Sequence, residues 1–378
     1  MKARDFIIDQ QCDNCKIIGI ASDGWGAYVD DNVNDVATIN INADGNINIR
    51  SVAKTASDYN TYAIENNSAG KISLSGEKID LSAENYGGGW NSLSYVSGIN
   101  HFMGTTKLIA KNPDDSGVTI TSRGEEKFYI VGVDLQSKAV GQVVDVEKGG
   151  PIDVDDPLRR ESVIIESASN IIIDSQVKNQ SDSNSVVMGL IARHYSWLGD
   201  DLQKNAYGSY YLKADKKLLI QSISEGASSN KLAGIVLEVN EELVSGKENE
   251  NVFRGKNVEI VVSGKKAENK LNTEYHIYQD IWGDSDASAV ELLNGTISIT
   301  GDESVALLVD VSESANKVRG LASAAETTGA IDKGSDTGLF QYVSADGKGL
   351  LYLSKGQSTS KIESEHGSIE IKASAGRA

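Results

Sequence analysis

Proline and aromatic residues are scarce in this sequence. Its 378 residues include only 3 Pro, and Phe, Trp and Tyr together make up 6%. Apolar residues nevertheless reach 39% and charged residues 24%, a composition typical of a folded chain rather than a disordered one. The length fits one long domain or two ordinary ones. We therefore expect a packed core built largely from aliphatic side chains.

Basic residues are too few to balance the acidic ones. There are 36 Lys and Arg against 54 Asp and Glu, so the formal net charge is −18. Binding to phosphate groups requires clustered Lys and Arg that release counterions. This balance argues against nucleic acid, or an anionic membrane surface, as the main partner.

Long hydrophobic runs are absent as well. The longest covers residues 186–192, far short of the roughly 18 residues that cross a bilayer, so we expect no membrane insertion. The first residues lead directly into an alternating segment, without the apolar region and cleavage site of a signal peptide. The expectation is either a cytosolic protein or a piece excised from a longer chain.

The two cysteines, Cys12 and Cys15, lie close together in the sequence. A redox motif of the thioredoxin type needs a βαβ setting, and a zinc site needs two further ligands; neither is found nearby. The pair favours a small structural disulfide in an exported protein, and unpaired thiols remain the alternative.

A short phrase recurs through the chain: apolar, any, apolar, any, small. Its apolar residues alternate with period two, which is typical of a strand with one buried face. Most copies begin about 40 residues apart, and further short strands are expected before and after each copy. The phrase occurs at residues 18–22, 47–51, 79–83, 118–122, 171–175, 218–222, 258–262, 297–301 and 369–373.

This repeat predicts an all-β fold. A unit of three strands cannot bury its apolar face alone, whereas stacked units form a continuous core. We therefore expect a single-stranded parallel β-helix with three strands per coil, spanning residues 1–378 as one domain. Long loop excursions are expected at residues 134–161 and 312–337, with helix limited to a turn or two within 315–326. A sandwich or barrel is the alternative, but the series of hairpin turns that it needs is not seen.

The phrases Gly-Asn-Ile-Asn-Ile at 45–49, Ser-Gly-Val-Thr-Ile at 116–120 and His-Gly-Ser-Ile-Glu-Ile at 366–371 carry a family resemblance. With the acidic balance and the paired cysteines, nearly the whole chain resembles the passenger domain of bacterial autotransporter adhesins, the antigen 43-like branch of type V secretion. The resemblance implies a right-handed β-helical stalk, export through the outer membrane to the cell surface or into the medium, and attachment to host surfaces or self-association in biofilms. The translocator barrel of such proteins has alternating strands with aromatic girdles, which are not seen after Glu370, so we expect an excised passenger fragment.

Signals of catalysis are weak. The histidines His101, His194, His276 and His366 are scattered and show no metal-binding spacing. A polysaccharide-active enzyme, lyase or hydrolase, is the alternative function, because parallel β-helices can carry paired carboxylates on their outer face. Acidic clusters could also bind calcium. We expect no enzymatic activity and no cofactor, with calcium binding left open.

Aromatic residues flank the third strand of several units, in loops that stacked coils would align along one edge. Exposed there, they could stack on sugar rings or anchor a protein partner; otherwise they cap the stack or pack the loops. The expected partners are a host glycan, a host surface protein or a second copy of the chain. The candidate ligand-binding residues are Tyr86, Trp90, Tyr95, Tyr195, Trp197, Tyr207 and Trp282.

Overall fold

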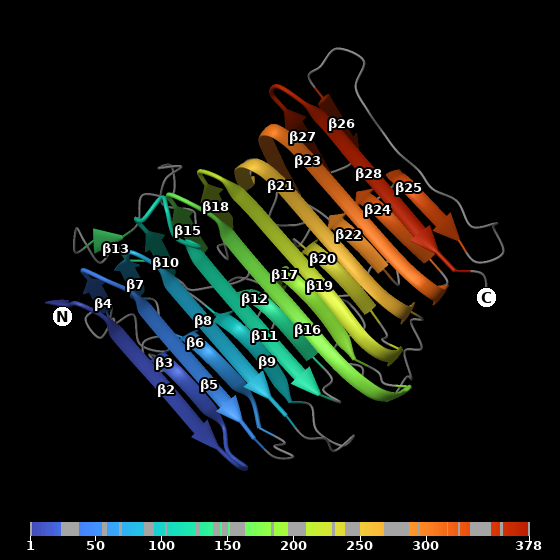
Figure 1. Ribbon diagram of the computed structural model, residues 1–378. Coiled ribbons are helices and arrows are strands. Elements are labelled where there is room, and N and C mark those ends of the chain that lie inside the picture. Colours follow the sequence, from blue (N-terminus) through green and yellow to red (C-terminus); the bar gives the residue numbers. More distant parts are fainter. Residues whose placement is uncertain are drawn as a thin grey trace.

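The computed structural model is all-β, with its strands stacked side by side from the N-terminus to the C-terminal region (Figure 1). It describes residues 2–23, 38–54, 59–67, 70–86, 94–102, 104–125, 129–138, 144–145, 150–151, 163–182, 185–195, 209–228, 231–238, 250–267, 287–292, 295–315, 317–323, 326–332, 349–355 and 358–376. These residues contain no helix, and therefore none that could span a membrane. The predicted all-β fold of parallel, solenoid-like strands is confirmed.

Most strands belong to three ladders of parallel pairs. Ladder one contains β1 (Lys2–Ala3), β4 (Thr38–Ala43), β7 (Lys71–Gly76), β10 (Thr105–Ala110), β15 (Val163–Ser167), β18 (Tyr210–Ala214), the first parts of β21 (Glu250–Ala267) and β23 (Gly295–Ala315), and β27 (Ser358–Ser364). Ladder two contains β2 (Phe6–Cys12), β5 (Ile47–Ala53), β8 (Ile79–Asn85), β11 (Val118–Glu125), β16 (Ile171–Asp182), β19 (Lys217–Ser228), the second parts of β21 and β23, and β28 (Ser368–Ala375). Ladder three contains β3 (Ile17–Asp23), β6 (Thr61–Asn67), β9 (Tyr95–His101), β12 (Tyr129–Lys138), β17 (Val186–Tyr195), β20 (Lys231–Glu238), β22 (Ala287–Leu292) and β24 (Lys317–Ser323).

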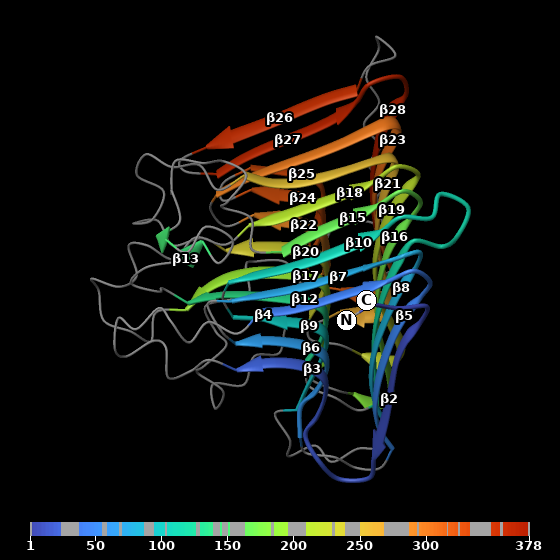
Figure 2. The same ribbon diagram turned by 90° about the vertical axis from the view of Figure 1, so that its left-hand side faces the viewer.

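The ladders enclose one aliphatic core, and ladder two faces the viewer in Figure 1 while Figure 2 shows the stack from the side. Strand β5 illustrates the pattern, because Ile47 and Ile49 are fully buried whereas Asn48 between them is exposed. The register then stacks each inward residue on its counterpart, as Ile49 on Leu81. Because β21 and β23 run through ladders one and two without a break, these two ladders form a single sheet.

Ladders two and three approach each other closely along a column of small residues. A Cβ atom built on Gly132 would lie 2.3 Å from Ile173 Cγ2, and one on Gly189 would lie 2.3 Å from Ile220 Cγ2. No real Cβ atom tolerates such a distance, so glycine is required at these positions. The same close approach of a built Cβ atom to an isoleucine Cγ2 occurs for Gly19 with Ile49, for Gly98 with Ile120 and for Gly234 with Ile260.

The two alanines of this column face leucines instead. The register aligns Ala63 with Gly19 and places it opposite Leu81, and it places Ala289 opposite Leu307 in the same way. Leucine branches at Cγ rather than at Cβ, so its side chain leaves room for one more methyl group. The chain therefore uses two matched pairs along this column, glycine with isoleucine and alanine with leucine.

The C-terminal end of the stack is finished by antiparallel strands. Strand β25 (Glu326–Asp332) pairs antiparallel with β24, and β26 (Gly349–Lys355) pairs antiparallel with β27. The short strands β13 (Val144–Asp145) and β14 (Gly150–Pro151) form a separate antiparallel pair.

Both expected loop excursions differ from the structure in their bounds. The segment 312–337 is largely extended, because β23 continues to Ala315 and is followed by β24 and β25, so the helical turn expected within 315–326 is wrong. The excursion expected from residue 134 begins later, since β12 runs to Lys138 with Asp134 and Leu135 buried.

The recurring phrase does not always occupy the same ladder. Seven copies lie in ladder two, but residues 18–22 lie in ladder three and 297–301 in ladder one. In the repeat that contains residues 297–301, the ladder-two strand is the second part of β23, which pairs with β28. The final interval between copies is long mainly because β24, β25 and β26 lie between β23 and β28, and the change of ladder adds a few residues.

A buried histidine lies inside the corner that follows β9. The His101 ring is fully buried, with Nδ1 2.9 Å from Thr106 Oγ1. Burial lowers the pKa of His101 from an ordinary 6.5 to about 3, against an opposing hydrogen bond with the Gly104 backbone. The imidazole is therefore neutral in the folded protein at any pH above this value.

Acidification from pH 7 to 5 should destabilise the fold through His101. Between pH 6.5 and 3 the unfolded chain binds a proton that the folded chain does not, so stability falls with pH across this window and the loss levels off near its lower end. At about 1.4 kcal/mol per pKa unit, we expect a loss of about 2 kcal/mol by pH 5. Urea denaturation at both pH values should show a smaller loss for His101→Asn, whereas His366→Asn, at an exposed histidine, should behave as wild type. Equal losses in all three proteins would contradict this role.

Candidate functional site

The outer face of ladder two carries regularly spaced side chains. Residues that alternate with the buried ones point outward along every strand, and the register aligns them in columns across the strands. One column runs from Asp9 through Arg50 and Ser82 to Asp174 and Gln221. The face therefore offers a continuous set of side chains drawn from distant parts of the sequence.

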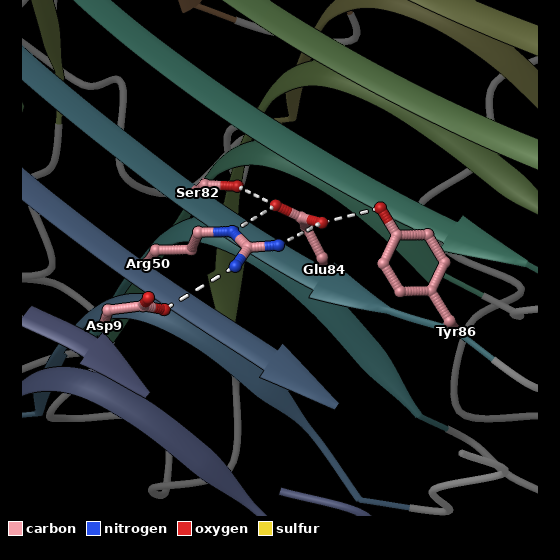
Figure 3. Close-up of polar contacts among 5 residues, drawn as sticks. All are labelled: Asp9, Arg50, Ser82, Glu84 and Tyr86. Carbon is pink, nitrogen blue, oxygen red and sulfur yellow. Dashed lines mark hydrogen bonds and ion pairs between the residues drawn. The ribbon is translucent and has the colours of Figure 1, made fainter. Parts of the chain in front are cut away.

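At the N-terminal side of this face, Glu84 is the centre of a polar cluster (Figure 3). Arg50 donates two hydrogen bonds, from Nε to Oε1 at 3.0 Å and from Nη2 to Oε2 at 3.3 Å. Ser82 Oγ donates to Oε1 at 2.8 Å, and Tyr86 Oη donates to Oε2 at 2.6 Å. Arg50 Nη1 also lies 3.6 Å from Asp9 Oδ1, which extends the cluster across three strands.

Electrostatics hold this cluster in one protonation state. Burial raises the pKa of Glu84, but hydrogen bonds from Arg50, Tyr86 and Ser82 outweigh that effect and leave the pKa below its ordinary value. Burial and the neighbouring Glu84 carboxylate raise the pKa of Tyr86 to about 12. Each Glu84 oxygen already accepts two hydrogen bonds, so this carboxylate is suited to fixing side chains rather than to accepting a proton from a substrate.

A second polar group lies further along the same face. Arg123 Nη2 is 3.6 Å from Asp174 Oδ2. The amides of Gln176 and Gln221 both donate to Asp174 Oδ1, at 2.9 and 2.8 Å. Together with the Glu84 cluster, this group makes the N-terminal half of the face rigid and polar.

Apolar side chains occupy the outward positions in the middle of the face. Ile172 is aligned with Leu219 on the next strand, and Val261 with Leu308. Each is only partly buried, although the inward residues beside them are fully buried. Outward apolar groups that gather on a sheet face commonly mark a contact surface. The members of this apolar strip are Ile172, Leu219, Ile223, Val261 and Leu308.

The apolar strip was not expected from the sequence, although the sequence carries a signal for it. The copies at 171–175 and 218–222 carry three apolar residues in succession where the phrase requires only two, and 307–309 does the same. The middle residue of each triplet points outward. The Glu84 cluster had no comparable signal, because Arg50 and Glu84 are 34 residues apart and meet only through strand register.

The structure places the predicted aromatic residues on different faces where it describes them. Tyr86 belongs to the Glu84 cluster, on ladder two. Tyr95 packs on Tyr129 of ladder three, with ring centroids 4.8 Å apart. The backbone of Tyr195 ends β17, but its side chain lies outside the described residues, as do Trp90, Trp197, Tyr207 and Trp282. The aromatic edge therefore stays a prediction.

Cys12 and Cys15 are joined by a disulfide bond at the end of β2. Among the described residues, no group of three or more His, Cys, Asp or Glu side chains is arranged to hold a metal ion. Calcium binding elsewhere in the chain also stays a prediction.

Comparison of the chain with protein-family models, with curated proteins and with solved structures gives no match.

Proposed function

We propose that the chain is the passenger domain of a bacterial autotransporter adhesin, displayed at the cell surface, and that it mediates adhesion by self-association. Under this proposal the three ladders form a right-handed parallel β-helix with three strands per coil. Such a stack is a rigid rod whose long faces repeat similar side chains. A rod of this kind presents many weak contacts at once, which together give useful avidity between cells.

The apolar strip on ladder two is the observation that carries the proposal. The strip gathers partly exposed Ile, Leu and Val side chains in neighbouring columns of the outer face of a protein with a net charge of −18, and such a grouping is typical of a contact surface. Because these side chains are already partly buried, completing the burial of each one at an interface contributes only part of the about 1.5 to 3 kcal/mol of full burial.

The charges around the strip are largely paired within each chain. Arg50 pairs with Glu84 and Asp9 and Arg123 pairs with Asp174 on one side of the strip, and Lys372 pairs with Glu370 on the other side. A two-fold interface centred on the strip would surround the apolar contact with these paired groups. The overall repulsion between acidic chains is screened over roughly 8 to 10 Å at physiological salt.

Replacing Leu219 by Lys should weaken self-association at least about tenfold, because it places a charge in the middle of the apolar contact. Sedimentation of purified protein between low and physiological salt should show wild type associating more strongly as salt rises. Clumping of cells that display each variant gives the second readout. Ile7→Lys is the matched control, since Ile7 is 70% exposed on the same ladder but lies outside the strip. Equal association of both variants would exclude the strip as the self-association contact. A wild type that stays monomeric and does not make cells clump would exclude self-association and favour a host ligand.

A further inference from the structure

The disulfide bond between Cys12 and Cys15 closes a short loop at the N-terminal end of the stack. Strand β2, which ends at Cys12, is the first strand of ladder two, and the loop leads from it to β3 (Figure 1). Both cysteines are only partly buried, and Asp13 and Asn14 between them are exposed. The disulfide therefore borders on solvent.

Hydrogen bonds already hold the backbone on both sides of this loop. Every residue of β2 is in register with a residue of β5, and the carbonyl oxygen of Cys12 accepts a hydrogen bond from Lys54 N at 2.9 Å. Beyond the loop, Ile17 N donates to Asn60 O at 3.2 Å, where β3 begins its pairing with β6. A disulfide restricts the unfolded chain least when its loop is short, as here. The fold therefore does not depend on this bond.

We propose that Cys12 and Cys15 form a labile disulfide that exchanges with external thiols and so joins the chain covalently to a thiol-bearing molecule. An accessible disulfide that the fold does not need is of the kind that thiols open readily. The pair follows a strand, whereas the attacking cysteine of many redox enzymes is activated at the N-terminus of a helix. The site is therefore a substrate of exchange and not a catalyst of it.

The exchange needs no reactant other than the thiol. Its thiolate attacks one sulfur atom and forms a mixed disulfide, while the bond between the cysteines breaks and the other cysteine leaves as a thiolate. A molecule with a second thiol can then attack the mixed disulfide, which releases both cysteines reduced and oxidises that molecule to a disulfide. The thiol can belong to a small molecule or to a protein, because the chemistry is the same.

Mass spectrometry after acid quenching measures this exchange on the intact, folded chain. Two probes represent the two sources: glutathione, and a peptide with a single reduced cysteine. For both, we expect the folded chain to form mixed disulfides at a rate within about tenfold of the rate in urea, where the chain is unfolded. The double variant Cys12→Ser, Cys15→Ser is the control. It should form no mixed disulfide, and its urea midpoint should equal that of wild type.

Reaction of both probes supports exchange with small and protein thiols alike, and reaction of glutathione alone supports exchange with small thiols. A larger difference between folded and unfolded rates for both probes would overturn the proposal, because the disulfide would then be protected by the fold. A lower urea midpoint in the double variant would also overturn it and assign the bond a structural role. The site lies outside the apolar strip, so neither result bears on self-association.

Discussion

Replacing Gly132 by Ala should destabilise the protein by about 3 kcal/mol, although it adds a single methyl group. The new Cβ atom would lie 2.3 Å from Ile173 Cγ2 and 2.5 Å from the carbonyl oxygen of Gly189. Both groups are fixed in the core, one by packing and the other by the ladder. The added methyl must therefore separate ladders two and three locally.

A second substitution should restore part of the lost stability. Ile173→Leu moves the branch away from Cβ and removes the first of the two close contacts, while the contact with the Gly189 oxygen remains. The double variant should therefore be more stable than the sum of the two single effects predicts, by about 1 to 2 kcal/mol. The chain already contains this combination at Ala63 and Leu81.

Chemical denaturation of the four proteins in this cycle measures the coupling directly. The reverse cycle provides the control: Leu81→Ile should be tolerated poorly beside Ala63 and better beside Ala63→Gly. Strict additivity in both cycles would mean that glycine and isoleucine are not matched across the ladders.

Replacing Lys231 by Met should cost about 3 to 5 kcal/mol, because it leaves the Glu291 carboxylate buried without a countercharge. Lys231 Nζ lies 2.7 Å from Glu291 Oε2, and the side chains are 0% and 3% exposed. Within the described residues, the other hydrogen bond to this oxygen comes from Ser288 Oγ, at 3.3 Å. One weak hydrogen bond cannot replace the lost ion pair.

The double variant Lys231→Met, Glu291→Leu should recover most of this stability, since two apolar side chains in a buried position need no countercharge. Urea denaturation at neutral pH compares the single and double variants with wild type. If Lys231→Met alone were as stable as wild type, the Glu291 carboxylate would have to reach solvent or another partner.

Alternation in the sequence predicts the inward and outward faces of the strands but not the ladder to which a strand belongs. Ile297 and Ile299 are buried in ladder one, and Ile369 and Ile371 are buried in ladder two, although both pairs follow the same phrase. The corner between ladders depends on turns rather than on alternation. The same limit explains why the segment 312–337 was expected to be a loop, since its small and polar residues resemble a connection.

The surface sites required the register, which the sequence pattern does not contain. Asp174 and Gln221 form a hydrogen bond across 47 residues. Arg254 and Thr300 become neighbours on ladder one for the same reason. A one-residue change in the alignment of two repeats would send these side chains to the opposite face.

The proposed adhesive contact is tested most directly by hydroxyl-radical footprinting of the protein in its monomeric and associated states, read residue by residue with mass spectrometry. The account predicts that Leu219, Ile223 and Val261 lose reactivity on association, whereas Ile7 and Tyr59, which are 70% and 51% exposed, keep theirs. Protection of Ile7 and Tyr59 with unchanged reactivity in the apolar strip would contradict it.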